Sequence, residues 1–416
     1  MAEDGAAASR WHSNWVGTDV DVFSSHPQGA ADGSGHRPRK RATKWSGPDC
    51  PPNVVFWRQV FIALTLMKAR WKFVLLLIFS GCLLAAEAGP EPLPEAVSNN
   101  AVAMLKLHGQ IELFSLMGLG AKKTWDSVSN QAYSIDADSG KAYTIHSVPG
   151  TVGRIAAMAV GAADYLFLFG GYVLYQGGGM SVPDVGIYEP AGDRWLRGTD
   201  MPVAVGDAVS GVYRDRYIYL IGGRSNNGPV TDVQIYDLEK SRWLRASSIP
   251  TAVFGHAGAL VGDSIVYVGG AQANPAGNSP RFVASTECWR GKIDRHDFRR
   301  IEWTKLPSHP GSAQFRIAAG GSEKDEMIYF SGGTDNPYDY NGIGYDGKPA
   351  EPSPVTFAFN LRTGKWETLD DNTPDPTMDH RGLLVTHEGL VIIGGMEKGQ
   401  QVTAKVALLS KQAKAK

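Results

Sequence analysis

Cysteine is scarce in this sequence and its charges nearly balance, and both facts exclude whole classes of protein. The 416 residues include three cysteines, Cys50, Cys82 and Cys288, which are too few for a disulfide framework. A formal net charge of −1 gives no general electrostatic basis for binding nucleic acid, so we expect no nucleic-acid partner. The one dense basic run, residues 37–44, lies in a Gly- and Ser-rich tract typical of disorder, with a nuclear-localisation signal as the lesser alternative.

Long apolar runs are also lacking, apart from residues 73–86. That run is too short to span a bilayer comfortably, follows three basic residues, and ends in Ala86-Glu87-Ala88. A charged segment, an apolar segment and small residues at an A-x-A site are typical of a secretory signal. We therefore predict a signal peptide at residues 67–88, cleavage after Ala88, and a periplasmic or secreted protein.

This interpretation divides the chain into three parts. Residues 1–66 are a disordered or non-native upstream extension, because a signal that begins near Met67 fits poorly with a start at Met1. Residues 89–416 form the folded domain, for which we expect a monomer. Two alternatives remain open for the signal: an uncleaved anchor, which would be the only membrane contact, and lipidation at Cys82.

What the sequence has in abundance is glycine, 49 residues in all, and much of it follows one pattern. An apolar strand ends in a glycine pair, where a Cβ would block a close turn. The pairs are Gly170-Gly171, Gly222-Gly223, Gly269-Gly270, Gly332-Gly333 and Gly394-Gly395, with a weaker copy at Gly118 and Gly120. Six copies of one unit predict a repeat architecture.

A second mark follows three of the five pairs, and a longer version of it, ending in Trp303, follows a fourth. An aromatic residue on the next strand precedes a tryptophan by seven positions, as in Tyr188 and Trp195, or Tyr236 and Trp243. This pattern resembles kelch repeats over residues 95–410. The resemblance implies an all-β, six-bladed kelch β-propeller with four-stranded blades. The last repeat lacks an outer strand, so we expect an N-terminal strand near residues 91–95 to close the ring; one or two β-sandwiches are the alternative fold.

The candidate site follows from strand order. The long polar loops after the glycine pairs and the segments that enter each innermost strand should emerge on one face. The entering segments carry polar residues that we expect to converge at the mouth of the central channel. They are Asn100, Arg154, Asp207, His256, Arg316 and Arg381, with Asp379 and His380 beside the last. Three arginines facing one cavity favour an anionic or carbohydrate ligand, although each polar residue alone could serve only to join blades.

The loop at residues 334–353 is the most unusual stretch. Its Tyr338, Tyr340 and Asn336 are residue types that suit sugar recognition. A calcium loop built from Asp335, Asp339 and Asp346 is a lesser alternative, because their spacing does not match an EF-hand. An ordered surface loop without a ligand also remains open. We expect no cofactor and no metal.

Exported six-bladed kelch proteins of the N-acetylneuraminate epimerase (sialic-acid mutarotase) type are similar in layout. The resemblance implies an isomerase, with Asp207, His256, Asp379 and His380 as candidate acids and bases and with Arg154, Arg316 and Arg381 holding a carboxylate. That family has a Glu after the glycine pair of blade four. Here Ala271 and Gln272 follow the pair, while Arg281 stands at about the family's arginine position.

Two other functions remain open. A protein-interaction module would use the mouth arginines to bind acidic segments. A copper-radical oxidase would need a cysteine crosslinked to a tyrosine, for which Cys288 is the one candidate in the folded domain, and no matching histidine pair is present.

Overall fold

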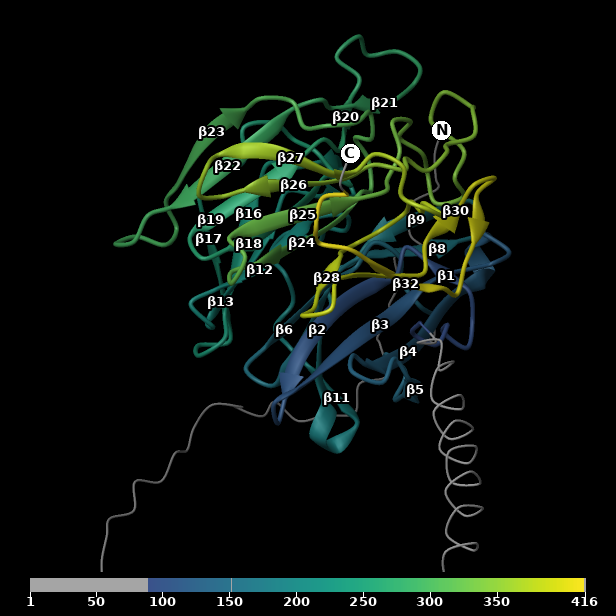
Figure 1. Ribbon diagram of the computed structural model, residues 1–416, viewed down its shortest axis with the longest axis vertical. Helices are drawn as coiled ribbons and strands as arrows, with labels where there is room; N and C mark the ends of the chain where they lie inside the picture. The colour runs from purple at the N-terminus through teal and green to yellow at the C-terminus, as the bar shows by residue number, and fades with distance from the viewer. Residues whose placement is uncertain (1–88, 151, 415–416) are drawn as a thin grey trace, which may run out of the picture. The chain divides into compact units, whose positions relative to one another are not determined.

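A computed structural model describes residues 89–150 and 152–414, and there the chain forms strands with two short 3-10 turns (Figure 1). The turns are η1 (Trp125–Ser127) and η2 (Pro190–Gly192). The predicted upstream extension, the predicted signal peptide, Cys50 and Cys82 lie outside the described residues. Within those residues, no helix has the length and apolar character needed to cross a membrane.

The first three sheets follow one another along the chain. The first contains β1 (Val97–Ser98), β2 (Ala101–Leu107), β3 (Gln110–Gly120), β4 (Val128–Asp136) and β5 (Ala142–Ile145). The second contains β6 (Met158–Ala162), β7 (Tyr165–Phe169), β10 (Val185–Glu189) and β11 (Arg194–Arg197). The third contains β12 (Val209–Tyr213), β13 (Tyr217–Ile221), β16 (Val233–Asp237) and β17 (Arg242–Arg245).

The last three sheets repeat this antiparallel order. The fourth contains β18 (Ala257–Val261), β19 (Ser264–Val268), β22 (Cys288–Ile293) and β23 (Ile301–Leu306). The fifth contains β24 (Ala318–Ser322), β25 (Met327–Ser331), β26 (Thr356–Asn360) and β27 (Lys365–Asp370). The sixth contains β28 (Leu384–Val385), β29 (Leu390–Ile393) and β32 (Val406–Leu409).

Four small ribbons rise from the loops that follow the glycine pairs. They pair β8 (Tyr172–Tyr175) with β9 (Gly178–Ser181), β14 (Arg224–Ser225) with β15 (Gly228–Pro229), β20 (Ala271–Ala273) with β21 (Phe282–Ala284), and β30 (Met396–Glu397) with β31 (Gln401–Val402). The six larger sheets are the blades of a β-propeller, which confirms the fold predicted from the repeats.

The second strand of each blade is buried on both faces, which explains its unbroken apolar sequence. In β13, Ile218, Tyr219, Leu220 and Ile221 are all fully buried. The reason is that the blades pack face to face. Six of the seven clusters of buried apolar residues each combine side chains from two adjacent blades, while the seventh lies under the loops at one end of the channel.

The spacing of seven between aromatic residue and tryptophan has a direct structural cause. Tyr188 on β10 and Trp195 on β11 are cross-strand partners whose ring centroids are 5.1 Å apart. The Trp195 indole N–H then donates to the carbonyl of His146 in the preceding blade at 2.8 Å. Trp243 and Trp366 make the same kind of bond to the blade before them. The repeated tryptophan therefore ties consecutive blades together at their outer edges.

The N-terminal segment joins the last blade to the first (Figure 1). The N–H of Leu93 donates to the carbonyl of Ala404, and that of Val97 to Thr403, just before β32. Val97 also begins β1, which pairs with β3 of the first blade. The described residues give the sixth blade three strands. Residues 91–95 do not form its fourth strand. The N–H of Leu93 donates to Ala404, two residues before β32. The N–H groups of Met201 and Ile249, which follow the outer strands β11 and β17, donate in the same way two residues before β10 and β16, so Leu93 corresponds to a residue that follows an outer strand.

Candidate functional site

A collar of six residues surrounds the channel where the innermost strands begin. Each blade contributes one of them, and all six have a positive φ between 51° and 76°. They are Asn99, Ala156, Asp207, Gly255, Arg316 and Asp379. A positive φ is costly for residues other than glycine, so the collar is held by its surroundings.

Backbone hydrogen bonds link the collar from blade to blade. The N–H of Asp207 donates to the carbonyl of Ala156 at 2.9 Å, that of Gly255 to Asp207 at 2.9 Å, and that of Arg316 to Gly255 at 2.8 Å. The N–H of Asn99 donates to the carbonyl of Asp379 at 3.1 Å, which crosses the seam between the last and first blades. The left-handed backbone is what turns each N–H toward the neighbouring blade.

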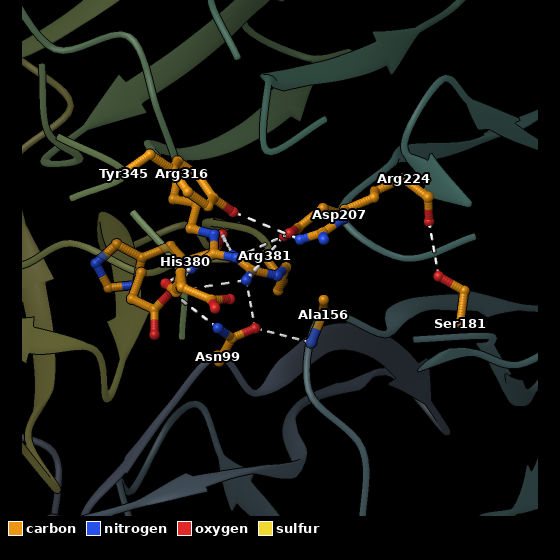
Figure 2. A network of polar contacts seen from close by, with 11 residues as sticks. Asn99, Ala156, Ser181, Asp207, Arg224, Arg316, Tyr345, His380 and Arg381 are labelled. Atoms are coloured by element: carbon orange, nitrogen blue, oxygen red, sulfur yellow. Dashed lines mark hydrogen bonds and ion pairs between the residues drawn. The ribbon is translucent and has the colours of Figure 1, made fainter. Parts of the chain in front are cut away.

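The collar side chains form a buried charge network (Figure 2). The Arg316 guanidinium is 2.9 Å from the Asp207 carboxylate and 3.0 Å from that of Asp379. Arg381 is 2.8 Å from Asp207 and 3.6 Å from Asp379. All four side chains are at most 4% exposed. Two cations therefore face two anions, and the network is neutral without any ligand.

Opposite charges keep Asp207 and Arg316 in their charged forms. Burial alone would raise the pKa of Asp207, but the guanidinium groups of Arg316 and Arg381 outweigh it and hold that pKa below its ordinary value. Burial alone would lower the pKa of Arg316, yet the carboxylates of Asp207 and Asp379 raise it well above its ordinary value. The predicted cost of placing arginines at the mouth is thus offset by the acids of the collar.

Asn99, which the sequence analysis did not select, completes the network. Its side-chain amide donates to the Asp379 carboxylate at 3.0 Å, and its oxygen accepts from the N–H of Ala156 at 2.8 Å and from Arg381. The sequence analysis chose Asn100 instead. Asn100 donates to Ser115 and to the carbonyl of Ile393, so it joins the first and last blades as an ordinary buried polar residue.

Arg154 and His256 were also expected at the ring positions that Ala156 and Gly255 occupy. The Arg154 guanidinium lies 3.9 Å from the Asp184 carboxylate and, in the described part of the chain, makes no ion pair with the collar carboxylates. His256 is 6% exposed and packs edge-on against Tyr267 with ring centroids 5.2 Å apart. Of the three arginines predicted to meet, the structure brings together Arg316 and Arg381.

Both predicted histidine bases are buried in their neutral form. Burial lowers the pKa of His256 to about 4 and that of His380 to about 4. A ring nitrogen of His380 bonds the Thr377 hydroxyl at 2.9 Å. These surroundings are those of structural histidines.

The loop of residues 334–353 folds over the collar. Tyr338 is fully buried, packs against Phe315 with centroids 5.4 Å apart, and lies under the Arg316 guanidinium. Arg316 also donates to the carbonyl of Asp339 at 3.0 Å. The far end of the loop is held by Gln400, whose amide donates to Ala350 and to Glu351, each at 2.8 Å. The loop therefore covers the charge network on this face.

The remaining residues predicted from this loop have different places. Tyr340 is partly buried beside the apolar cluster at the mouth. Asn336 bonds the Asp346 carboxylate at 3.0 Å, and so it shapes the loop. In the described residues, the loop's acids do not gather into a group of three or more that could hold a metal ion.

Arg224 is the functional candidate that the sequence analysis missed. Its guanidinium carbon lies 5.4 Å from the ring centroid of Tyr172, 5.5 Å from Phe254 and 5.3 Å from Phe282. Its guanidinium donates a hydrogen bond to the Tyr345 hydroxyl at 3.5 Å. Within residues 89–150 and 152–414, no carboxylate lies within ion-pairing distance of it, but the Asp207 carboxylate is close enough for the positive charge of Arg224 to help lower the pKa of Asp207 (Figure 2). Its place directly after Gly222-Gly223 was the available signal.

Arg281 lies beside it, on the ribbon of blade four. Its side chain is exposed, and its guanidinium carbon lies 5.0 Å from the centroid of the same Phe282 ring. Cys288, the oxidase candidate, is a buried thiol whose pKa is raised to about 11 by burial. Such a thiol packs as a small apolar residue.

Comparisons with known proteins agree with this architecture. The family described as "Kelch motif" matches residues 208–250, which are the third blade. The chain is 37% identical over 112 residues to the Kelch-like protein terF of Aspergillus terreus (strain NIH 2624 / FGSC A1156). That match covers 27% of this chain and 22% of terF, so it spans about a fifth of that relative. The solved structure titled "Structure of YjhT" superimposes with a TM-score of 0.61 and 16% identity over 77% of this chain and 97% of that one, which is a likeness of fold.

Proposed function

We propose that this six-bladed kelch propeller binds a small anionic ligand, of the sugar-acid class, at the loop-covered mouth of its channel. The observation that supports the proposal is Arg224, a guanidinium that rests on three aromatic rings and has no carboxylate partner in the described residues. Cations without a partner at a partly buried site favour an anion. Arg316 and Arg381 are already neutralised, so Arg224 is the better anchor.

The aromatic surroundings support an organic anion over an inorganic one. Tyr172, in the ribbon of blade two, and Tyr345, in the loop of blade five, are partly buried and both contact Arg224. Aromatic faces stack on the C–H groups of a sugar ring, while arginine binds a carboxylate in bidentate fashion. The proposed ligand therefore combines a carboxylate with an apolar or C–H-rich face.

Binding is better supported than mutarotation. Mutarotation needs one group that takes a proton and another that gives one. The candidate acids Asp207 and Asp379 are engaged by arginines beneath the loop of residues 334–353, and His256 and His380 are buried and neutral. We therefore propose a binding role and expect no acceleration of anomer exchange, which NMR can measure directly.

Calorimetric titration of the full chain with glucuronate, N-acetylneuraminate and neutral glucose tests the proposal. The acids should bind, and glucose should bind at least tenfold more weakly. Arg224→Gln should weaken acid binding by roughly tenfold to a hundredfold, because a charge-assisted hydrogen bond contributes about 1.5–3 kcal/mol. Arg242→Gln, on the exposed outer strand β17, is the matched control and should bind as the parent does. Equal binding of acids and glucose would contradict the proposal.

Export is a separate proposal, because the signal sequence lies outside the described residues. N-terminal sequencing of the secreted protein should give Gly89 as the first residue. A product that is retained in the membrane fraction would favour the uncleaved anchor.

A further inference from the structure

The ring of Phe282 is shared by two guanidinium groups. Arg224 lies 5.3 Å and Arg281 lies 5.0 Å from its centroid. Because both distances end at one ring, the two guanidinium carbons are separated by no more than the sum of the two. The ring itself is 3% exposed and is fixed edge-on by Phe254 and Tyr345. Two like charges therefore lie against one buried aromatic ring.

Neither guanidinium has an acidic partner. Among the described residues, no carboxylate lies within ion-pairing distance of Arg224 or Arg281, whereas Arg316 and Arg381 each meet two. Burial raises the pKa of Tyr172 and of Tyr345, and the Asp339 carboxylate on the covering loop raises both further, so this carboxylate lies near the site. The Asp207 carboxylate acts on Arg224 from beyond ion-pairing distance, but Arg316 and Arg381 already share that carboxylate. Two cations without ion-pair partners on one ring repel each other, and an anion between them removes that repulsion.

The surroundings of Arg281 leave room for part of a ligand. A hollow of about 540 Å³ lies at the turn that joins β20 to β21. The hollow is lined by Ala273, Asn274, Gly277, Asn278, Ser279 and Arg281. Amide, hydroxyl and guanidinium groups together suit a carboxylate with neighbouring hydroxyls.

We propose that the ligand of this site is an organic dianion, with one anionic group at Arg224 and the second at Arg281. This inference rests on the proposed function and narrows it from sugar acids in general to those with two acidic ends. A monoanion satisfies one arginine and leaves the other uncompensated. A dianion of suitable length neutralises both and removes their mutual repulsion.

The test compares three ligands with one carbon skeleton: glucose, glucuronate and glucarate, which carry no, one and two carboxylates. Titrations of the full chain are run at constant ionic strength, because exposed charge pairs are screened by salt. We expect glucarate to bind at least tenfold more tightly than glucuronate. Arg281→Gln should remove that preference while glucuronate binds as before, and Arg224→Gln should weaken both acids at least tenfold.

Two further variants make the assignment sharper. Asp339→Asn removes the nearby negative charge and should tighten both acids, glucarate more than glucuronate. Arg242→Gln should leave all affinities unchanged, and unliganded thermal midpoints verify that each variant is folded. Equal affinity for glucuronate and glucarate would overturn the dianion proposal, and so would an unchanged preference for glucarate in Arg281→Gln. The proposed function would still stand if both acids bound more tightly than glucose. If neither acid binds, both proposals are wrong.

Discussion

Asp379 lies at the centre of the buried charge network and is fully buried. It accepts hydrogen bonds from Arg316 and from Asn99, both at 3.0 Å, and Arg381 is 3.6 Å away. A buried network of this kind need not stabilise a fold more than apolar residues would. Removing one member is different, because it leaves two buried arginines to share the one carboxylate of Asp207.

Asp379→Asn is therefore expected to destabilise the protein by about 3–5 kcal/mol. Asparagine keeps the side-chain size and tolerates the φ of +76°, so the change in the free energy of unfolding reports the removal of the charge alone. Asp375→Asn is the matched control, since Asp375 also has a positive φ but is 77% exposed and pairs with Lys405 at 3.4 Å. Its loss should stay under about 1 kcal/mol in urea titrations. Similar losses for both variants would mean that the network is not the cause.

The buried histidines predict how stability depends on pH. Burial holds the pKa of His256 and of His380 at about 4, below the ordinary value near 6.5. The unfolded chain therefore takes up protons first as pH falls, and stability should be full above about pH 6.5 and decline toward pH 4. Each histidine contributes up to roughly 3 kcal/mol to that decline.

Urea titrations between pH 7 and pH 4 measure the effect. His256→Gln and His380→Gln should each flatten the pH profile. His387→Gln should not, because the His387 side chain is 60% exposed. A parent profile that is flat from pH 6.5 to pH 4 would contradict the assignment of both histidines as buried and neutral.

At the scale of the strand, glycine sets how closely neighbouring blades approach. A Cβ on Gly320 in β24 would lie 2.0 Å from the carbonyl oxygen of Leu383, just before β28 of the next blade. Gly161 in β6 faces the carbonyl of Met104 at 2.1 Å in the same way. Backbone atoms cannot give way as side chains do, so these glycines fix the narrow packing around the channel.

Gly320→Ala should accordingly cost roughly 1–3 kcal/mol through overpacking. Gly192→Ala in the turn η2 is the control, because the nearest atom to its Cβ is the end of the partly buried Glu189 side chain at 3.0 Å, and a side-chain end can move. That change should stay within about 0.5 kcal/mol. Thermal unfolding of the two variants beside the parent decides the point, and equal midpoints would refute the close-approach explanation.

The blades were predictable from the sequence, while the collar was predictable only in part. The glycine pairs and the Tyr–Trp spacing require particular residue types, so they can be recognised in the sequence. The collar is set by a backbone conformation that Ala156, Gly255 and Arg316 all adopt, and no residue type marks it. The sequence analysis therefore found Asp207 and Arg316 but selected Asn100 in place of Asn99 and Arg154 in place of Ala156.

Arg224 escaped for a related reason. Its significance comes from Tyr172 in the ribbon of blade two and from Phe254 and Phe282 in blade four, which meet only in the folded ring. Tyr338, in contrast, was predicted to bind a ligand and is fully buried. Its residue type suits a sugar platform, but the covering loop turns it inward under Arg316.

For the whole molecule, a closed ring has one seam, and here the N-terminal segment holds it. Leu93 is 3% exposed and shares a cluster with residues of the first blade and with Leu384 and Val391 of the last. Its N–H also donates to Ala404 at 2.8 Å. If the ring is one cooperative unit, weakening this seam should lower the stability of every blade together.

Leu93→Ala should therefore cost about 2–5 kcal/mol, as expected for a buried leucine, and unfolding should remain a single transition. Leu408→Ala in β32 is the matched control, because Leu408 in the same blade is 42% exposed and should lose less than about 1 kcal/mol. Hydrogen exchange by mass spectrometry should show faster exchange in the first and last blades of Leu93→Ala, since each blade loses its partner when the seam opens. Two separate transitions, or equal losses for the two leucines, would show instead that the sixth blade unfolds by itself and that the ring does not depend on its N-terminal closure.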